Sequence, residues 1–247
     1  MVTILHMSTE RRGRWTPTTS RDGSGGVSVV DTTEIRWFAT GALPRGVRRW
    51  FVGPTAAAEE RRDRYLLDER TDVGVKFRNG ETLELKTRRR TGATVELTGG
   101  TAGVLERWTK WTPADGLVPH SPSARWIDVD KWIVKRRFSL DGADVEVSSD
   151  QNTDPLCDAE IVAIRAGATT AWSFSFAARG PQHSRPTAIR AAWQALLRAD
   201  APTVLQIGFD RGESMGYPEW LGRREHQRRA AQAGVNRLPH HCRGMKP

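Results

Sequence analysis

Residues 73–88 read VGVKFRNGETLELKTR, the pattern of a β-hairpin with charged residues on one face. Asn79-Gly80 lies between two short β-patterned runs and predicts a hairpin turn, because both residues tolerate the positive φ angles of tight hairpins. Side chains alternate across a strand, so Lys76 and Arg78 share one face of the first run. On the second run the residues that share a face are Glu84, Lys86 and Arg88. The opposite face carries Val75, Phe77, Leu83 and Leu85, which makes each strand charged on one side and largely apolar on the other.

Four further segments repeat this alternation: TEIRW (33–37), VLERWTKW (104–111), WIVKRRF (132–138) and, with acids, CDAEIVAI (157–164). The charged residues that share a face are Glu34 with Arg36, Glu106 with Lys110, Lys135 with Arg137, and Asp158 with Glu160. The pattern predicts a sheet whose apolar face packs on helices and whose charged face lines a wet or ligand-filled space. The alternative is the solvated face of an open sandwich.

The net charge of +9 and the isoelectric point near 10.3 favour an anionic partner: nucleic acid, a phosphorylated small molecule or a membrane surface. Cys157 and Cys242 are too far apart for a disulfide framework or a zinc motif. No apolar run approaches the roughly 18 residues of a membrane span, and MVTILHM is too short for a signal peptide. The expectation is therefore a cytoplasmic protein without a membrane partner. Its oligomeric state is left open.

The expected organisation is one domain, residues 31–222, between two basic and disordered ends, residues 1–30 and 223–247, which lack apolar periodicity. Short helices are predicted over 43–51 and 187–199, and a strand at RYLLD (64–68). The fold class is mainly β (α+β): about eight antiparallel strands closing into a tunnel-like barrel with a few flanking helices. Closure suits such strands because it leaves no edge exposed.

In their order and spacing, TEIRW, VGVKFRNGETLELKTR, ERWTKW, WIVKRR and CDAEIVAI resemble the CYTH superfamily of triphosphate tunnel metalloenzymes. The resemblance covers about residues 32–165. It implies an eight-stranded antiparallel barrel whose tunnel holds a triphosphate on basic residues and a divalent metal on acidic ones. The family opens on two alternating Glu and a Lys; here the frame falls on Thr32, Glu34 and Arg36, so the first acid is missing.

The site that the resemblance implies has three parts. Glu160 and Glu34 are the candidate catalytic residues. The candidate phosphate-binding residues are Arg36, Lys76, Arg78, Lys86, Lys110, Lys135 and Arg137. The candidate ligands for Mg²⁺ or Mn²⁺ are Glu34, Glu106, Asp158 and Glu160, and Glu84 or Glu146 could replace the acid missing at Thr32. Arg88, Lys131 and Arg136 are instead expected at the surface, at the rim and on the exterior, respectively.

Three functions remain open. The first is a metal-dependent phosphohydrolase that acts on inorganic triphosphate or on a nucleoside or thiamine triphosphate, using a metal-held water. The second is a binding module of the same fold that holds a phosphorylated ligand without turnover. The third, less favoured, is a nucleic-acid-binding β-barrel that uses the positive charge and the Trp residues. A panel of triphosphates assayed for phosphate release with Mg²⁺ or Mn²⁺ separates the first two.

Overall fold

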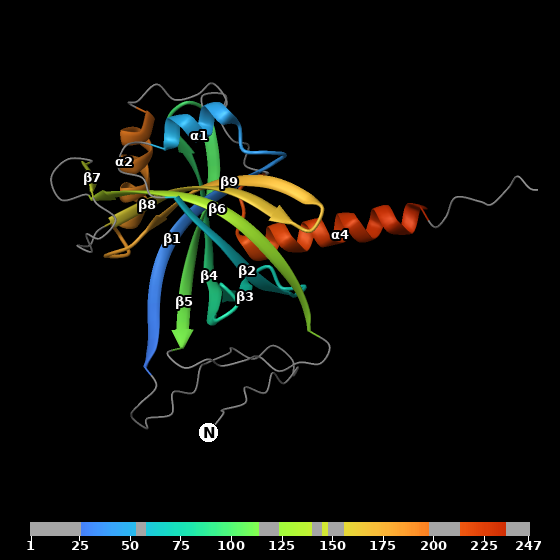
Figure 1. Cartoon of the computed structure of the whole chain (residues 1–247). Coiled ribbons are helices and arrows are strands. Elements are labelled where there is room, and N and C mark those ends of the chain that lie inside the picture. The colour runs from blue at the N-terminus through green and yellow to red at the C-terminus, as the bar shows by residue number, and fades with distance from the viewer. Residues whose placement is uncertain are drawn as a thin grey trace, which may run out of the picture.

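The computed structural model describes residues 26–52, 58–113, 124–139, 145–147, 156–197 and 213–235. This part of the chain contains nine strands and three helices (Figure 1). The strands are β1 (Val27–Thr40), β2 (Ala58–Leu67), β3 (Val73–Arg78), β4 (Thr82–Leu97), β5 (Thr101–Pro113), β6 (Arg125–Ser139), β7 (Val145–Val147), β8 (Leu156–Ala166) and β9 (Thr169–Ala178). The helices are α1 (Arg45–Phe51), α2 (Arg185–Leu197) and α4 (Tyr217–Val235).

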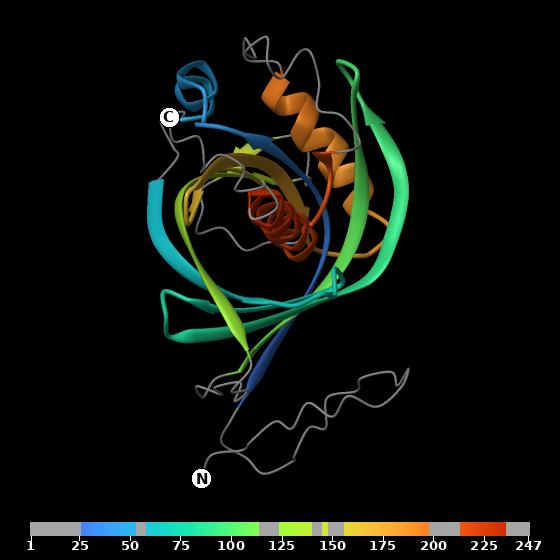
Figure 2. The ribbon, with the colours of Figure 1, turned by 90° about the vertical axis from the view of Figure 1, so that its right-hand side faces the viewer.

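The strands form one antiparallel sheet that closes into a ring (Figure 2). Its order is β2-β3-β4-β5-β1-β9-β8-β6, and β2 then pairs with β6 from Ala58 opposite Val134 to Leu67 opposite Arg125. β7 pairs only with β6 and lies outside the ring. The predicted mainly β fold, with about eight antiparallel strands and flanking helices, is confirmed.

The turn between β3 and β4 is the predicted hairpin. Asn79 has φ 52° and Gly80 has φ 77°, and Arg78 pairs with Thr82 across the turn. Asn and Gly tolerate these left-handed angles, which match the twist of the flanking strands. The turn therefore fixes the register in which Lys76 lies opposite Glu84.

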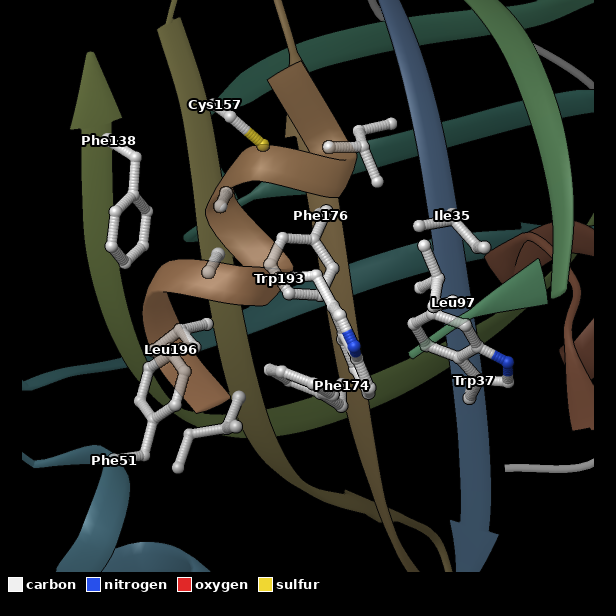
Figure 3. Close-up of a cluster of buried hydrophobic side chains, with 14 of the residues drawn as sticks. Ile35, Trp37, Phe51, Leu97, Phe138, Cys157, Phe174, Phe176, Trp193 and Leu196 are labelled. Carbon is white, nitrogen blue, oxygen red and sulfur yellow. The ribbon is translucent and has the colours of Figure 1, made fainter. Parts of the chain in front are cut away.

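The outer face of the ring packs on α1 and α2 around a core of large apolar side chains (Figure 3). α2 presents its buried residues at helical spacing, and Trp193 lies against Trp37 and Phe174 with ring centroids 6.1 and 6.0 Å away. Burying one such side chain stabilises the fold by about 1.5–3 kcal/mol. Both helices were predicted from the sequence, at 43–51 and 187–199, and both are confirmed within two residues.

The inside of the ring has an apolar part, which the start of α4 fills (Figure 2). Trp220 stacks on Phe38 at 4.7 Å, and Tyr217 stacks on Tyr65 at 5.5 Å. The segment before the helix is held by the strands, because Met215 N–H donates to the Arg36 carbonyl at 3.0 Å. The rest of the inner face is charged.

Three boundaries expected from the sequence were wrong. β1 already begins at Val27, inside the arm expected at 1–30, because main-chain pairing with β5 needs no buried side chain there. α4 continues to Val235, inside the tail expected at 223–247, and Glu225 pairs with Arg228 and Arg229 along the helix. β2 starts at Ala58, six residues before the expected RYLLD strand. The expectations for 1–25 and 236–247 lie outside the described residues.

None of the helices in the described ranges is long and apolar enough to cross a membrane.

Candidate functional site

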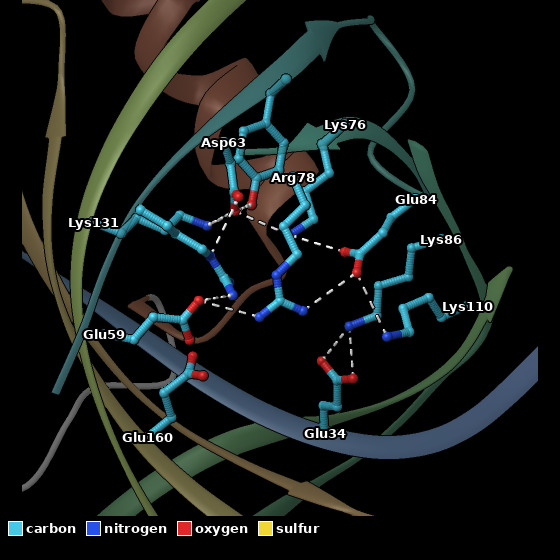
Figure 4. Close-up of polar contacts among 12 residues, drawn as sticks. Glu34, Glu59, Asp63, Lys76, Arg78, Glu84, Lys86, Lys110, Lys131 and Glu160 are labelled. Atoms are coloured by element: carbon cyan, nitrogen blue, oxygen red, sulfur yellow. Dashed lines mark hydrogen bonds and ion pairs between the residues drawn. The ribbon is translucent and has the colours of Figure 1, made fainter. Parts of the chain in front are cut away.

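The charged faces of the strands turn into the ring, where their side chains form a network of ion pairs (Figure 4). Strand alternation places them there, because the opposite positions of the same strands, such as Ile35 and Val134, lie in the core under α1 and α2. The residues that meet across the interior in direct ion pairs include Glu34, Arg36, Lys76, Arg78, Lys86, Lys110 and Glu160 from the predicted site.

Asp63 of β2 is the most deeply buried acid of the network, and the sequence analysis missed it. Its Oδ2 accepts hydrogen bonds from Lys131 Nζ at 2.8 Å and from Lys76 Nζ at 3.0 Å. Arg61 Nε lies 3.3 Å from its Oδ1. Burial would raise the pKa of Asp63, but the three cations, led by Lys131, hold it well below its usual value.

Lys131 is fully inside rather than at the expected rim. Its side chain is 3% exposed, and Nζ donates to the Tyr65 hydroxyl at 2.6 Å and lies 4.1 Å from the centroid of the Tyr217 ring. Burial, together with the charge of Lys76, lowers its pKa well below the usual value. One signal for this cluster was present: Glu59, Arg61, Asp63 and Tyr65 alternate like the other charged runs.

Glu84 of β4 connects cations of its two neighbouring strands, β3 and β5. Its carboxylate lies 3.0 Å from Lys76 Nζ and 3.7 Å from both Arg78 and Lys110. Burial would raise the pKa of Glu84, but Lys76 and Lys110 hold it below the usual value. Lys110 is the less compensated partner, since burial and its cationic neighbours lower its pKa.

Glu34 and Lys86, which the sequence placed in the site in different roles, form a close ion pair. Lys86 Nζ donates to both carboxylate oxygens, at 2.6 and 2.7 Å, and the Thr32 hydroxyl donates to one of them at 2.6 Å. Burial opposes ionisation here too, but Lys86 lowers the pKa of Glu34. Thr32 thus orients the Glu34 carboxylate.

Glu160 pairs with Arg36. An Arg36 amino group lies 3.3 Å from Glu160, and the other donates to the Ser173 hydroxyl at 3.0 Å. Burial would raise the pKa of Glu160, but Arg36, Lys135 and other cations lower it to about 2. The pair therefore stays ionised throughout the physiological range.

Arg88 was expected at the surface, and this was wrong. It bonds Glu106 inside the ring and lies 3.4 Å from Glu219 of α4. The Trp108 indole N–H also donates to Glu106, at 3.0 Å. Glu106 nevertheless has a raised pKa, because burial outweighs these partners. Strand alternation places Arg88 inward, because β4 continues to Leu97.

Lys135 and Arg137 both pair with Asp158, further along β6 and β8. Arg137 Nε donates to Asp158 at 2.6 Å, and Lys135 Nζ lies 4.0 Å from it. Arg136 points the other way, as expected, and bonds Glu146 at 2.8 Å. Since Arg136 faces the outer core beside Phe51 and Phe138, Glu146 does not replace the acid missing at Thr32, and that suggestion was wrong.

Solvent reaches the cations of the interior more than the carboxylates beneath them. The side chains of four cations are between a third and two fifths exposed: Lys86 33%, Lys110 35%, Arg78 37% and Lys135 41%. The paired carboxylates are at most about half as exposed: Asp63 0%, Glu106 7%, Glu84 9%, Glu34 13%, Asp158 16% and Glu160 19%. Glu59, at 46%, is the exception. The interior therefore presents positive charge to solvent.

As arranged, the carboxylates do not fit a divalent metal. Each predicted metal ligand is already paired with a cation: Glu34 with Lys86, Glu106 with Arg88, Asp158 with Arg137, and Glu160 with Arg36. Within the described ranges, no three Asp, Glu, His or Cys side chains are grouped closely enough to hold a metal ion. Binding of Mg²⁺ or Mn²⁺ thus stays a prediction of the resemblance.

Comparison with known proteins assigns the chain to no family. No model of a known protein family matches the chain, and no curated protein is significantly similar to it. The arrangement of the ring and of its charged lining is therefore what any statement about function rests on.

Proposed function

We propose that the inside of the ring binds a phosphorylated small-molecule anion, of which tripolyphosphate is the simplest representative. One observation carries the proposal: four partly exposed cations line the interior above carboxylates that solvent hardly reaches. Buried carboxylates fix the positions of the ammonium and guanidinium groups, and those groups keep donors for a ligand. Charge-assisted hydrogen bonds to phosphate oxygens are about twice as strong as neutral ones.

The charge balance of the interior supports an anionic ligand. Lys76, Arg78 and Lys110 share Glu84, and Lys110 is held by it only at 3.7 Å. Like charges brought together inside a protein repel one another and are costly to remove from water. An anion placed between them relieves this repulsion, and it would raise the lowered pKa of Lys110.

A small ligand is favoured over nucleic acid by the position of these cations. They lie on the inner faces of strands that form a closed ring, whereas a nucleic-acid surface must meet an extended phosphate backbone. The alternative prediction was an open sandwich whose charged strand faces meet the surrounding solvent. It is not supported, because the charged faces point into the ring.

Isothermal titration calorimetry with tripolyphosphate in EDTA tests the proposal. Lys110→Met removes one charge-assisted contact and should weaken binding by roughly 10- to 100-fold. Arg64→Met removes the same charge from the exposed outer face of β2, where Arg64 lies 3.4 Å from Asp128, and should leave the affinity unchanged. A wild-type protein without heat of binding, or equal losses in both variants, would contradict the proposal.

Hydrolysis of the bound anion stays a prediction of the resemblance to the triphosphate tunnel metalloenzymes. Phosphate release from inorganic, nucleoside and thiamine triphosphates, with and without Mg²⁺ or Mn²⁺, tests it directly. The binding proposal does not depend on turnover, since the ion pairs that position the cations are formed by the chain itself.

A further inference from the structure

The chain uses arginine almost everywhere that it needs a positive charge. Only six of its 38 basic residues are lysines, at positions 76, 86, 110, 131, 135 and 246, and the rest are arginines. Within the described ranges, all of the lysines, Lys76, Lys86, Lys110, Lys131 and Lys135, lie on the inner faces of the ring strands. Arginines occur on both faces. The outward-facing ones include Arg62 and Arg64 of β2. Over this part of the chain, lysine is thus confined to the interior, whereas arginine is not.

Arginines and lysines of the interior also differ in what they contact. Arg36, Arg61, Arg88 and Arg137 have side chains at most 15% exposed, and each is held by one or more carboxylates. Three of the four partly exposed cations are lysines: Lys86, Lys110 and Lys135. The arginines thus hold the buried carboxylates in place, while these lysines face the solvent inside the ring. Arg78 is the one arginine among the exposed cations of the described interior.

We infer that Lys86, Lys110 and Lys135 contact the phosphoryl oxygens of the ligand and that arginine cannot replace them there. This inference rests on the proposed anion-binding function and names the groups that determine it. An ammonium group is a compact charge that approaches a phosphate oxygen from any direction. A guanidinium group is larger and planar, and it frequently forms two parallel hydrogen bonds with a single carboxylate.

The neighbours of these lysines explain why arginine would fail. Lys86 Nζ already lies 2.6 Å from Glu34, so an arginine at that position would bond both Glu34 oxygens with its fork and turn away from the solvent. At position 110 the longer side chain would reach Glu84, now 3.7 Å away, in the same manner. At position 135 it would reach Asp158, now 4.0 Å away. In each case the charge is kept, but two of the five N–H donors are bound by the acid and the guanidinium plane is fixed toward that acid rather than toward the ligand.

The test is a set of charge-conserving substitutions, measured by calorimetry with tripolyphosphate in EDTA. Lys86→Arg, Lys110→Arg and Lys135→Arg are made singly and together, and Arg64→Lys on the outer face is the matched control. We expect the triple variant to bind at least about tenfold more weakly, the change that follows from losing one charged hydrogen bond. The control should bind like the wild type. Melting temperatures measured in parallel show whether each variant is folded.

The outcomes separate this inference from the function on which it rests. A folded triple variant that binds tripolyphosphate as tightly as the wild type overturns the inference and leaves anion binding intact. A wild-type protein that does not bind tripolyphosphate overturns both. Should the triple variant not fold, the single variants decide: losses at positions 86, 110 and 135 support the inference, and wild-type affinity in all of them contradicts it.

Discussion

Glu160 illustrates how single charged side chains are held inside the ring. It is 19% exposed and lies beside Arg36, whose own side chain is 15% exposed. Charges this far from water are stable only when paired, and removing one partner leaves the other uncompensated. The same reasoning applies to the Asp63 cluster and to the pair of Glu34 with Lys86.

Acid should therefore destabilise the protein through Glu160 among other carboxyls. Its pKa in the folded state, about 2, lies below the ordinary value of 4.5, because Arg36 and its neighbours favour the charged form against burial. A group with a depressed folded pKa contributes stability above the unfolded pKa and loses it as the pH falls. Urea denaturation at pH steps from about 5 to 2 should show a falling free energy of unfolding. Glu160→Gln should flatten that slope, and Glu60→Gln on the outer face should not. An unchanged slope in Glu160→Gln would refute this role.

Asp63 and Lys131 should behave as a coupled pair. Asp63→Asn leaves Lys131, Lys76 and Arg61 without their shared acid and should cost roughly 3–5 kcal/mol of stability. Adding Lys131→Met removes one of the uncompensated positive charges and should recover part of the lost free energy of unfolding. A double-mutant cycle from urea denaturation measures this coupling. Additive effects of the two substitutions would show that the pair is not a unit.

α4 is the element that links the apolar and charged parts of the interior. Its first turn stacks Tyr217 and Trp220 on Tyr65 and Phe38, and Glu219 reaches Arg88. The close approach depends on Gly216, where a Cβ atom would lie 2.7 Å from the Trp108 ring and 3.1 Å from Glu106. The helix is thereby seated directly against the strands that carry the charges.

Gly216→Ala should therefore lower the melting temperature, by an overpacking cost of about 1–3 kcal/mol. Gly222→Ala, six residues further along α4, is the matched control, because a Cβ there meets no atom within 4 Å. Alanine is also the better helix former, so this control should be neutral or slightly stabilising. Differential scanning calorimetry of both variants is the measurement. Equal melting temperatures in the two variants would contradict the close seating of α4.

For the whole molecule, the strands and the side on which their charges lie were predictable from the sequence. The closure of the sheet into a ring was only partly predictable. The alternation in VGVKFRNGETLELKTR fixes both the hairpin and the face that Lys76, Glu84 and Lys86 share. Pairing of β2 with β6 joins segments about 70 residues apart, and AEERRDRYLL (58–67) is polar on both faces until Tyr65. The contact between Asp63 and Lys131 depends on that pairing, because the two residues lie on β2 and β6. The alternation of Glu59, Arg61, Asp63 and Tyr65 was a local signal for the inward face of β2, but it does not predict which strand β2 pairs with.

The proposed function is the binding of a phosphorylated anion by the inner cations of the ring. A crystal structure of the protein with tripolyphosphate tests this most directly. We predict density for the anion inside the ring, with phosphoryl oxygens within hydrogen-bond distance of Lys86, Lys110 and Lys135, at about 2.7–3.2 Å. Density only on the outer surface, or none at a saturating concentration while the inner ion pairs stay unchanged, would contradict it.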